Sequence, residues 1–225
     1  MNGSFSWLSL SIWLPIAFGG VLLCMGNAPA TRIRWLALLG AVLSFLVTLP
    51  LYAGFDAKSA ALQFVEKSSW IERFNIQYYL GIDGIALWLV LLTAFITIIV
   101  VIAAWEVITD RVAQYFASFL ILSGLMIGVF CAADGMLFYV FFEATLIPMY
   151  IIIGIWGGSN RVYASFKFFL YTLMGSLLML VAMVYLYRAT NSFDLAVWAK
   201  AKLSLTEQTY LFFAFLAAFA VKVPM

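Results

Sequence analysis

Histidine is absent from the 225 residues of this chain, and cysteine occurs only twice. Without histidine, the chain lacks the commonest metal ligand and the side chain that most often titrates near neutral pH. Cys24 and Cys131 are far apart and both lie in apolar runs, so we interpret them as packing residues rather than as a disulfide. Neither a haem-attachment motif nor an iron–sulfur ligand set can be built from these residues. The sequence therefore predicts that this chain binds no metal or redox cofactor.

Charged residues are also scarce. They make up 10% of the chain, whereas about a quarter of a typical soluble domain is charged. The net charge is only +2 and there is no basic run, so nothing indicates nucleic-acid binding. Hydrophobic residues make up 66% of the chain, which is more apolar surface than a water-soluble core could bury. The chain is therefore predicted to be a multi-pass membrane protein surrounded by the lipid bilayer.

Seven apolar runs predict an all-α fold with about seven transmembrane helices. The first run could be a signal peptide, but no basic residue precedes it and six more runs follow, so we interpret it as a retained helix. The seventh run stops within what would be the membrane, so we expect the sequence to be a fragment of a longer protein. The runs are residues 6–25, 35–55, 84–105, 112–133, 136–156, 168–187 and 208–225.

The connections between the runs carry weaker signals. In residues 56–83 aromatic residues are interleaved with charged ones, which predicts an ordered loop on the membrane surface. Alternation over residues 73–78 fits a short strand, so a small hairpin is possible there. Asp134 precedes the fifth run and suits a helix N-cap. Arginines in the short loops after odd-numbered helices favour a cytoplasmic side for those loops, and hence an N-terminus outside.

Two charged residues lie well inside apolar runs, Glu143 in the fifth and Lys222 in the seventh. A charge at bilayer depth costs on the order of 2.5 kcal/mol or more. Glu143 lies ~12 Å and Lys222 ~21 Å along their helices at 1.5 Å per residue, and the long lysine can recover much of that offset. An ion pair is therefore geometrically allowed. Each charge also lies near a proline, Pro148 and Pro224, which leaves a free carbonyl in each helix. Broken helices of this kind form ion sites in transporters.

Such a pair can move protons, because burial favours the neutral form of each group while the opposite charge favours the ionised form. The alternative is a static salt bridge that only fixes helix packing, although such pairs add little stability. Lys167 begins the sixth run. It is either an interfacial lysine that reaches toward the headgroups or a residue that supplies the Glu143 site.

The sequence resembles a known family. The segments FFEATLIPMYIIIGIWGG, FKFFLYTLMGSLLMLVA and FAFLAAFAVKVPM look like the M-type antiporter-like subunit of respiratory complex I. The resemblance implies a fourteen-helix subunit with two inverted five-helix repeats, of which this chain is the first part. Residues 1–105 would hold three leading helices and residues 106–225 most of the first repeat, within one membrane domain. Glu143 would be the glutamate of the fifth helix and Lys222 the lysine of a broken seventh helix.

The resemblance also implies a function. The chain would be a proton-translocating membrane subunit of an H⁺-translocating NADH:ubiquinone reductase, with L-type and N-type antiporter-like neighbours. NAD, FMN, iron–sulfur clusters and quinone would belong to partner subunits. We expect a bacterial inner membrane location with a periplasmic N-terminus. Two alternatives stay open: a subunit of an Mrp-type cation/proton antiporter, and a non-pumping membrane scaffold of a related hydrogenase-like complex.

Overall fold

The computed structural model describes residues 6–26 and 28–223 of the chain. Its contacts divide the chain into two compact units. The first comprises Met1–Glu66 and Leu80–Ala132, and the second comprises Lys67–Tyr79 and Ala133–Met225. This division concerns packing. It does not test the predicted boundary at residue 105, which concerns repeat membership and stays a prediction.

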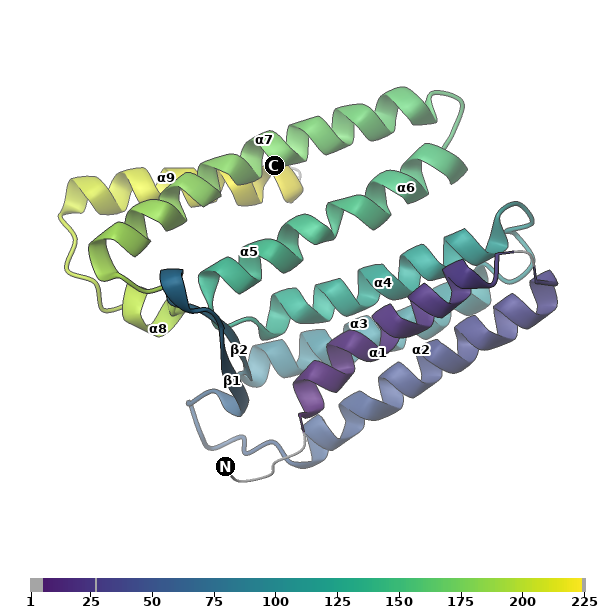
Figure 1. Cartoon of the computed structure of the whole chain (residues 1–225), viewed down its shortest axis with the longest axis horizontal. Helices are drawn as coiled ribbons and strands as arrows, with labels where there is room; N and C mark the ends of the chain where they lie inside the picture. The colour runs from purple at the N-terminus through teal and green to yellow at the C-terminus, as the bar shows by residue number, and fades with distance from the viewer. Residues whose placement is uncertain (1–5, 27, 224–225) are drawn as a thin grey trace. The chain divides into compact units, whose positions relative to one another are not determined.

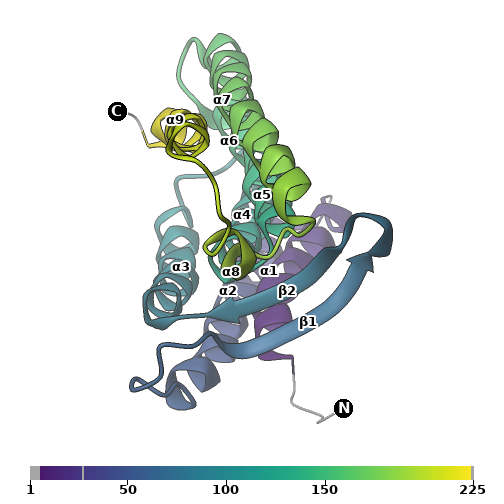
Figure 2. The same ribbon diagram turned by 90° about the vertical axis from the view of Figure 1, so that its left-hand side faces the viewer.

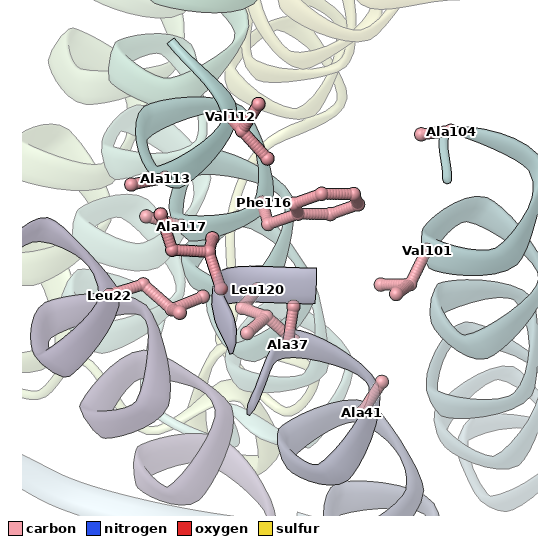
Figure 3. Close-up of a cluster of buried hydrophobic side chains, with 11 residues drawn as sticks. Leu22, Ala37, Ala41, Val101, Ala104, Val112, Ala113, Phe116, Ala117 and Leu120 are labelled. Carbon is pink, nitrogen blue, oxygen red and sulfur yellow. The ribbon is translucent and has the colours of Figure 1, made fainter. Parts of the chain in front are cut away.

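The first unit is a bundle of four long helices. Helix α1 packs against α2 and α4, and α3 packs against α2 and α4. The helices are α1 (Trp7–Cys24), α2 (Ala30–Ala53), α3 (Gly84–Ala103) and α4 (Val112–Cys131). Phe116 and Leu120 of α4 lie in the buried cluster that joins the helices, together with Leu22 and Ala37 (Figure 3). Cys24 and Cys131 are both free, so the prediction that they form no disulfide is confirmed.

Small residues set the distance between α1 and α4. A Cβ atom added at Gly124 would lie 2.5 Å from the Ile12 carbonyl oxygen, and one added at Gly19 would lie 2.9 Å from that of Ala117. Lipid tails are as apolar as the side chains, so apolar surface gains little when it moves from lipid to a helix–helix contact. Membrane helices are therefore held together by close backbone approach and van der Waals contact. The glycines supply that close approach in the first unit.

The surface loop contains a β-hairpin. Strand β1 (Gln63–Ile71) pairs with β2 (Ile76–Ile82) in a two-stranded sheet, and Figure 2 shows the two curved strands side by side. The turn holds a 3-10 segment, Glu72–Phe74, and Asn75 in the left-handed region at φ 50°. The hairpin predicted as possible is therefore confirmed. It is longer than the alternation at residues 73–78 indicated, because the exposed β1 has no clear alternation.

Side-chain hydrogen bonds join the hairpin to a helix start in each unit. In the first unit, the Glu66 carboxylate accepts hydrogen bonds from the N–H groups of Leu8 (2.8 Å) and Ser9 (3.1 Å) at the start of α1. In the second unit, the buried Asp134 carboxylate accepts from Gln77 N–H (3.2 Å) and caps the next helix through Met136 N–H (2.9 Å). The predicted N-cap role of Asp134 is confirmed.

The second unit is built around its longest helix, α7. Helices α5, α6, α8 and α9 all contact α7, and Figure 1 shows α6 and α9 running alongside it. The second-unit helices are α5 (Gly135–Ala144), α6 (Leu146–Trp156), α7 (Arg161–Thr190), α8 (Leu195–Trp198) and α9 (Leu205–Lys222). The sixth predicted run, residues 168–187, is therefore part of a longer helix that begins seven residues earlier, about two helical turns, and ends three residues later.

Among the described residues, six segments are long and apolar enough to cross a membrane. They are α1, α2, α3, α4, the combined α5 and α6, and α7. Helix α9 corresponds to the seventh predicted run and is 18 residues long, but it is not among the six. Large apolar side chains such as Trp88, Leu170 and Phe213 are exposed on these helices, as expected of surfaces that face lipid. The predicted all-α, multi-pass membrane fold is confirmed.

Candidate functional site

The fifth membrane segment is interrupted in its middle. Helix α5 ends at Ala144, α6 begins at Leu146, and Thr145 forms a turn between them. Pro148 has no N–H and cannot donate to the Ala144 carbonyl one turn earlier. The break lies inside a span, Gly135–Trp156, that is apolar enough to cross the membrane. The discontinuity that Pro148 predicts in the fifth helix is therefore confirmed.

Glu143 lies directly before this break. Its side chain is half-buried, and its Oε1 atom is fully buried without a hydrogen-bond partner in the part of the chain that the structure describes. A buried carboxylate oxygen without a partner is energetically costly. Buried polar groups are nearly always satisfied, so an exception of this kind marks a candidate site of proton or ion exchange.

Lys222 is the last residue of α9, and its side chain reaches the same break. Its Nζ atom donates a hydrogen bond to the Phe142 carbonyl oxygen at 2.8 Å and lies 3.4 Å from Thr145 Oγ1. The same atom lies 3.6 Å from the centre of the Phe142 ring, which adds a cation–π contact. All of these contacts come from residues within two positions of Glu143 in the sequence.

The expected depth match between the two charges is therefore present, but the ion pair is not formed in this structure. Lys222 donates to the residue that precedes Glu143, rather than to the Glu143 carboxylate. Over residues 6–26 and 28–223, the one side-chain ion pair is between Lys67 and Asp194. Sequence spacing could place both charges at one level. It could not tell which acceptor the lysine uses, because the break offers a backbone carbonyl as well as a carboxylate.

Packing around α9 fixes where Lys222 points. Phe219, one turn before Lys222, makes edge-to-face contacts with Phe138 and Phe142 of α5, with ring centres 6.4 and 6.1 Å away. On α7, a Cβ atom at Gly175 would lie 2.9 Å from Val221 Cγ2, so only glycine allows α9 to approach this closely. The residue next to Lys222 is thus held against α7, while Phe219 holds α9 against α5.

The other predicted site residues lie elsewhere. Lys167 is exposed on the second turn of α7, with its Nζ atom 5.8 Å from the centre of the Tyr163 ring, and no hydrogen bond or ion pair joins it to Glu143. An exposed position beside an aromatic ring fits an interfacial lysine. Pro224 falls outside the described residues. Val223, the last described residue, is extended at φ −96° and ψ 99°, so α9 ends directly after Lys222.

Sequence reasoning did not single out Phe142 or Thr145. The Thr145 hydroxyl donates to the Phe142 carbonyl at 2.7 Å and faces the Lys222 ammonium. One signal was available, because a threonine three residues before a proline can bond backwards to a carbonyl of its own helix. The contribution of Phe142 is a backbone atom and a ring face, and no residue pattern marks either.

Among the described residues, no three His, Cys, Asp or Glu side chains come together as a group that could hold a metal ion. The site consists of the Glu143 carboxylate, the Lys222 ammonium, the Thr145 hydroxyl and the Phe142 backbone carbonyl. This set can exchange protons and hydrogen bonds, and it contains no nucleophile activated by a neighbouring base.

Comparison with known proteins gives consistent matches. The family model described as NADH:quinone oxidoreductase/Mrp antiporter, TM, matches residues 132–225. The chain is 48% identical to NADH-quinone oxidoreductase subunit M of Rhodobacter capsulatus, over 97% of this chain and 45% of that protein. It is 44% identical to NADH-ubiquinone oxidoreductase chain 4 of Arabidopsis thaliana, over 97% of this chain and 44% of that protein.

Solved structures agree with the sequence matches. A chain of respiratory complex I from Thermus thermophilus with bound NADH superimposes with a TM-score of 0.84 and 30% identity, over 96% of this chain and 44% of that chain. A chain of the Mrp complex from Dietzia sp. has a TM-score of 0.81 at 16% identity, over 96% of this chain and 23% of that chain, which indicates a shared fold alone. The chain spans slightly less than half the length of the curated relatives that it matches, and over that length it is similar to antiporter-like membrane subunits such as NADH-quinone oxidoreductase subunit M.

Proposed function

We propose that this chain is part of a proton-translocating membrane subunit of an NADH-quinone oxidoreductase, and that Glu143 and Lys222 carry out its proton step. The observation that supports this most directly is the Glu143 carboxylate at the helix break, with a buried oxygen that has no partner among the described residues and with Lys222 bound one residue away. A static packing role would satisfy that oxygen. The names of the relatives supply the electron-transfer reaction to which the step is coupled.

The chemistry follows from the distance between the two charges. At an effective dielectric constant of 20, opposite charges 4 Å apart attract by about 4 kcal/mol. Close approach therefore favours the ionised forms of both groups. Separation leaves each group to the desolvation cost of the membrane interior, which favours the neutral forms. A change of distance driven from partner subunits would load and release protons. Electron transfer, with NAD, FMN, iron–sulfur clusters and quinone, is assigned to those partners.

The remaining assignments belong to the same proposal. L-type and N-type antiporter-like subunits are the proposed neighbours in the membrane, and a bacterial inner membrane with a periplasmic N-terminus is the proposed location. An Mrp-type cation/proton antiporter subunit is the second candidate, because the Mrp chain shares the fold. The two candidates differ in their driving reaction. The first requires NADH oxidation, and the second requires a sodium or proton gradient.

The test uses the full-length protein in its assembled complex. Glu143→Gln and Lys222→Ala are each expected to reduce NADH-driven proton pumping at least tenfold, measured as acidification of inverted membrane vesicles. Glu106→Gln and Lys202→Ala are matched controls at exposed positions and are expected to stay within twofold of the unmodified protein. Full pumping by both site variants would contradict the proposal and would leave the non-pumping scaffold. Pumping driven by sodium rather than NADH would favour the Mrp-type subunit.

A further inference from the structure

The Lys222 ammonium is held by the turn that separates α5 from α6. It donates to the Phe142 carbonyl at 2.8 Å, lies 3.4 Å from Thr145 Oγ1 and lies 3.6 Å from the centre of the Phe142 ring. These contacts provide a carbonyl, a hydroxyl and a ring face, and all three attract a cation. Lys222 is therefore bound without the Glu143 carboxylate, whose Oε1 has no partner among the described residues.

Thr145 is arranged to act as an acceptor for this ammonium. A hydroxyl has one donor and two acceptor positions. The Thr145 hydroxyl donates its hydrogen to the Phe142 carbonyl at 2.7 Å, so its lone pairs are left for a donor. Lys222 Nζ is the donor that faces it. The interruption of the helix at Thr145 leaves the Phe142 carbonyl accessible to both side chains.

We propose that Thr145 is a positioning residue that, with the Phe142 carbonyl, forms a second resting place for the Lys222 ammonium beside Glu143. This inference rests on the proposed proton step and adds to it. A lysine with two acceptors one residue apart can leave the carboxylate by a movement of its own side chain, without separation of the helices. While Lys222 is held at the carbonyl, the Glu143 carboxylate is free to take up or release a proton independently.

The alternative is that Thr145 only completes the backbone of its own helix. Threonine hydroxyls make such bonds elsewhere in the chain, for example Thr209 to the Leu205 carbonyl at 2.8 Å on the exposed surface of α9. In that case the Thr145 hydroxyl would be independent of Lys222. Coupling between Thr145 and Lys222 therefore distinguishes the two explanations.

The experiment compares Thr145→Val, which removes the hydroxyl at nearly constant shape, with Thr145→Ser, which keeps it. Both are made in the full-length protein within its complex. Thr145→Val is expected to reduce the protons pumped per NADH oxidised three- to tenfold, and Thr145→Ser is expected to restore at least half of the lost activity. Thr209→Val is the control for the loss of a threonine hydroxyl outside the site, and it should leave pumping unchanged. Equal pumping by the valine and serine variants would overturn the proposal.

A second readout does not depend on pumping. Thr145→Val is expected to lower the melting temperature of the purified protein in the presence of Lys222 and to have no further effect in a Lys222→Met background. The same shift in both backgrounds would overturn the proposal even if pumping is impaired. If the two positions are coupled in melting but Lys222→Met pumps normally, the proposed function fails, and the functional role of the resting place fails with it.

Discussion

The two compact units differ in the charged groups that their helices bring together. In the first unit, buried hydroxyls bond to carbonyls of their own helix, as Ser44 does to Gly40 at 2.7 Å, or to each other, as Thr97 does to Ser123 at 2.8 Å. Helices α1, α3 and α4 contain no charged residue. In the second unit, a carboxylate and an ammonium lie at a helix break, and one carboxylate oxygen has no partner in the described part of the chain.

This difference indicates which unit contributes stability and which contributes activity. A polar group satisfied within its own helix has one arrangement and contributes to a fixed bundle. A lysine that has a carbonyl, a hydroxyl and a nearby carboxylate has several arrangements of similar energy. Functional sites commonly depart from the best-packed arrangement at some cost in stability. The first unit is therefore expected to lose stability on substitution, whereas the second is expected to lose activity.

The largest effect on stability is expected from Gly124→Ala in the first unit. The added Cβ would lie 2.5 Å from the Ile12 carbonyl oxygen and 2.6 Å from Ile16 Cγ1, so α1 and α4 must separate. Overpacking against a rigid backbone should cost about 2–3 kcal/mol. Thermal melting of the full-length protein in detergent measures this effect as a lowered midpoint.

The matched control is Gly20→Ala on α1, where the added Cβ meets no atom within 4 Å. Alanine is favoured over glycine in a helix by about 0.5–1 kcal/mol, so the control should melt at the same temperature or slightly higher. If Gly124→Ala melts like Gly20→Ala, close packing of α1 on α4 does not stabilise the first unit. The proposed difference between the two units would then be wrong.

The next largest effect is expected from Glu66→Ala, which removes the carboxylate that binds the first N–H groups of α1. Loss of an N-terminal cap costs about 1–2 kcal/mol. Glu72→Ala in the exposed turn of the same hairpin is the control, with an expected effect near zero. Hydrogen exchange at Leu8 and Ser9 should be faster in Glu66→Ala alone, and equal exchange in both variants would show that the hairpin does not hold the first helix.

A smaller effect of opposite sign is expected from Glu143→Gln in the second unit. Replacement of a partly buried charge by a neutral group of the same size is often neutral or stabilising, and here we expect a gain of at most about 1 kcal/mol. Melting should therefore shift upward while NADH-driven pumping falls. A large loss of stability would indicate that Glu143 is a packing residue, and that the two units do not differ as argued.

Much of the fold could be predicted from the sequence, because a membrane span has a simple signature. The apolar runs locate α1 to α7, and Pro148 locates the break in the fifth segment. The start of α7 was missed, because Arg161 and Lys167 interrupt the apolar run without interrupting the helix. Glu143 and Lys222 could be identified as charges at unusual depth. The role of the Phe142 carbonyl could not, because it depends on how α9 packs at Phe219 and Gly175.

The smallest effect is expected from Lys67→Met. Lys67 follows Glu66 directly in β1, but it belongs to the second unit. Lys67 pairs with Asp194 at 3.5 Å, and 45% of its side chain is exposed, so water screens the pair. Its Nζ atom also lies 4.2 Å from the centre of the Tyr79 ring. Exposed contacts of these kinds are worth about 0.5 kcal/mol or less, and methionine keeps the apolar length of the side chain. Melting of Lys67→Met should therefore match that of the unmodified protein within error, while Glu66→Ala one residue away melts earlier. A loss as large as that of Glu66→Ala would mean that the hairpin stabilises the second unit as strongly as the first.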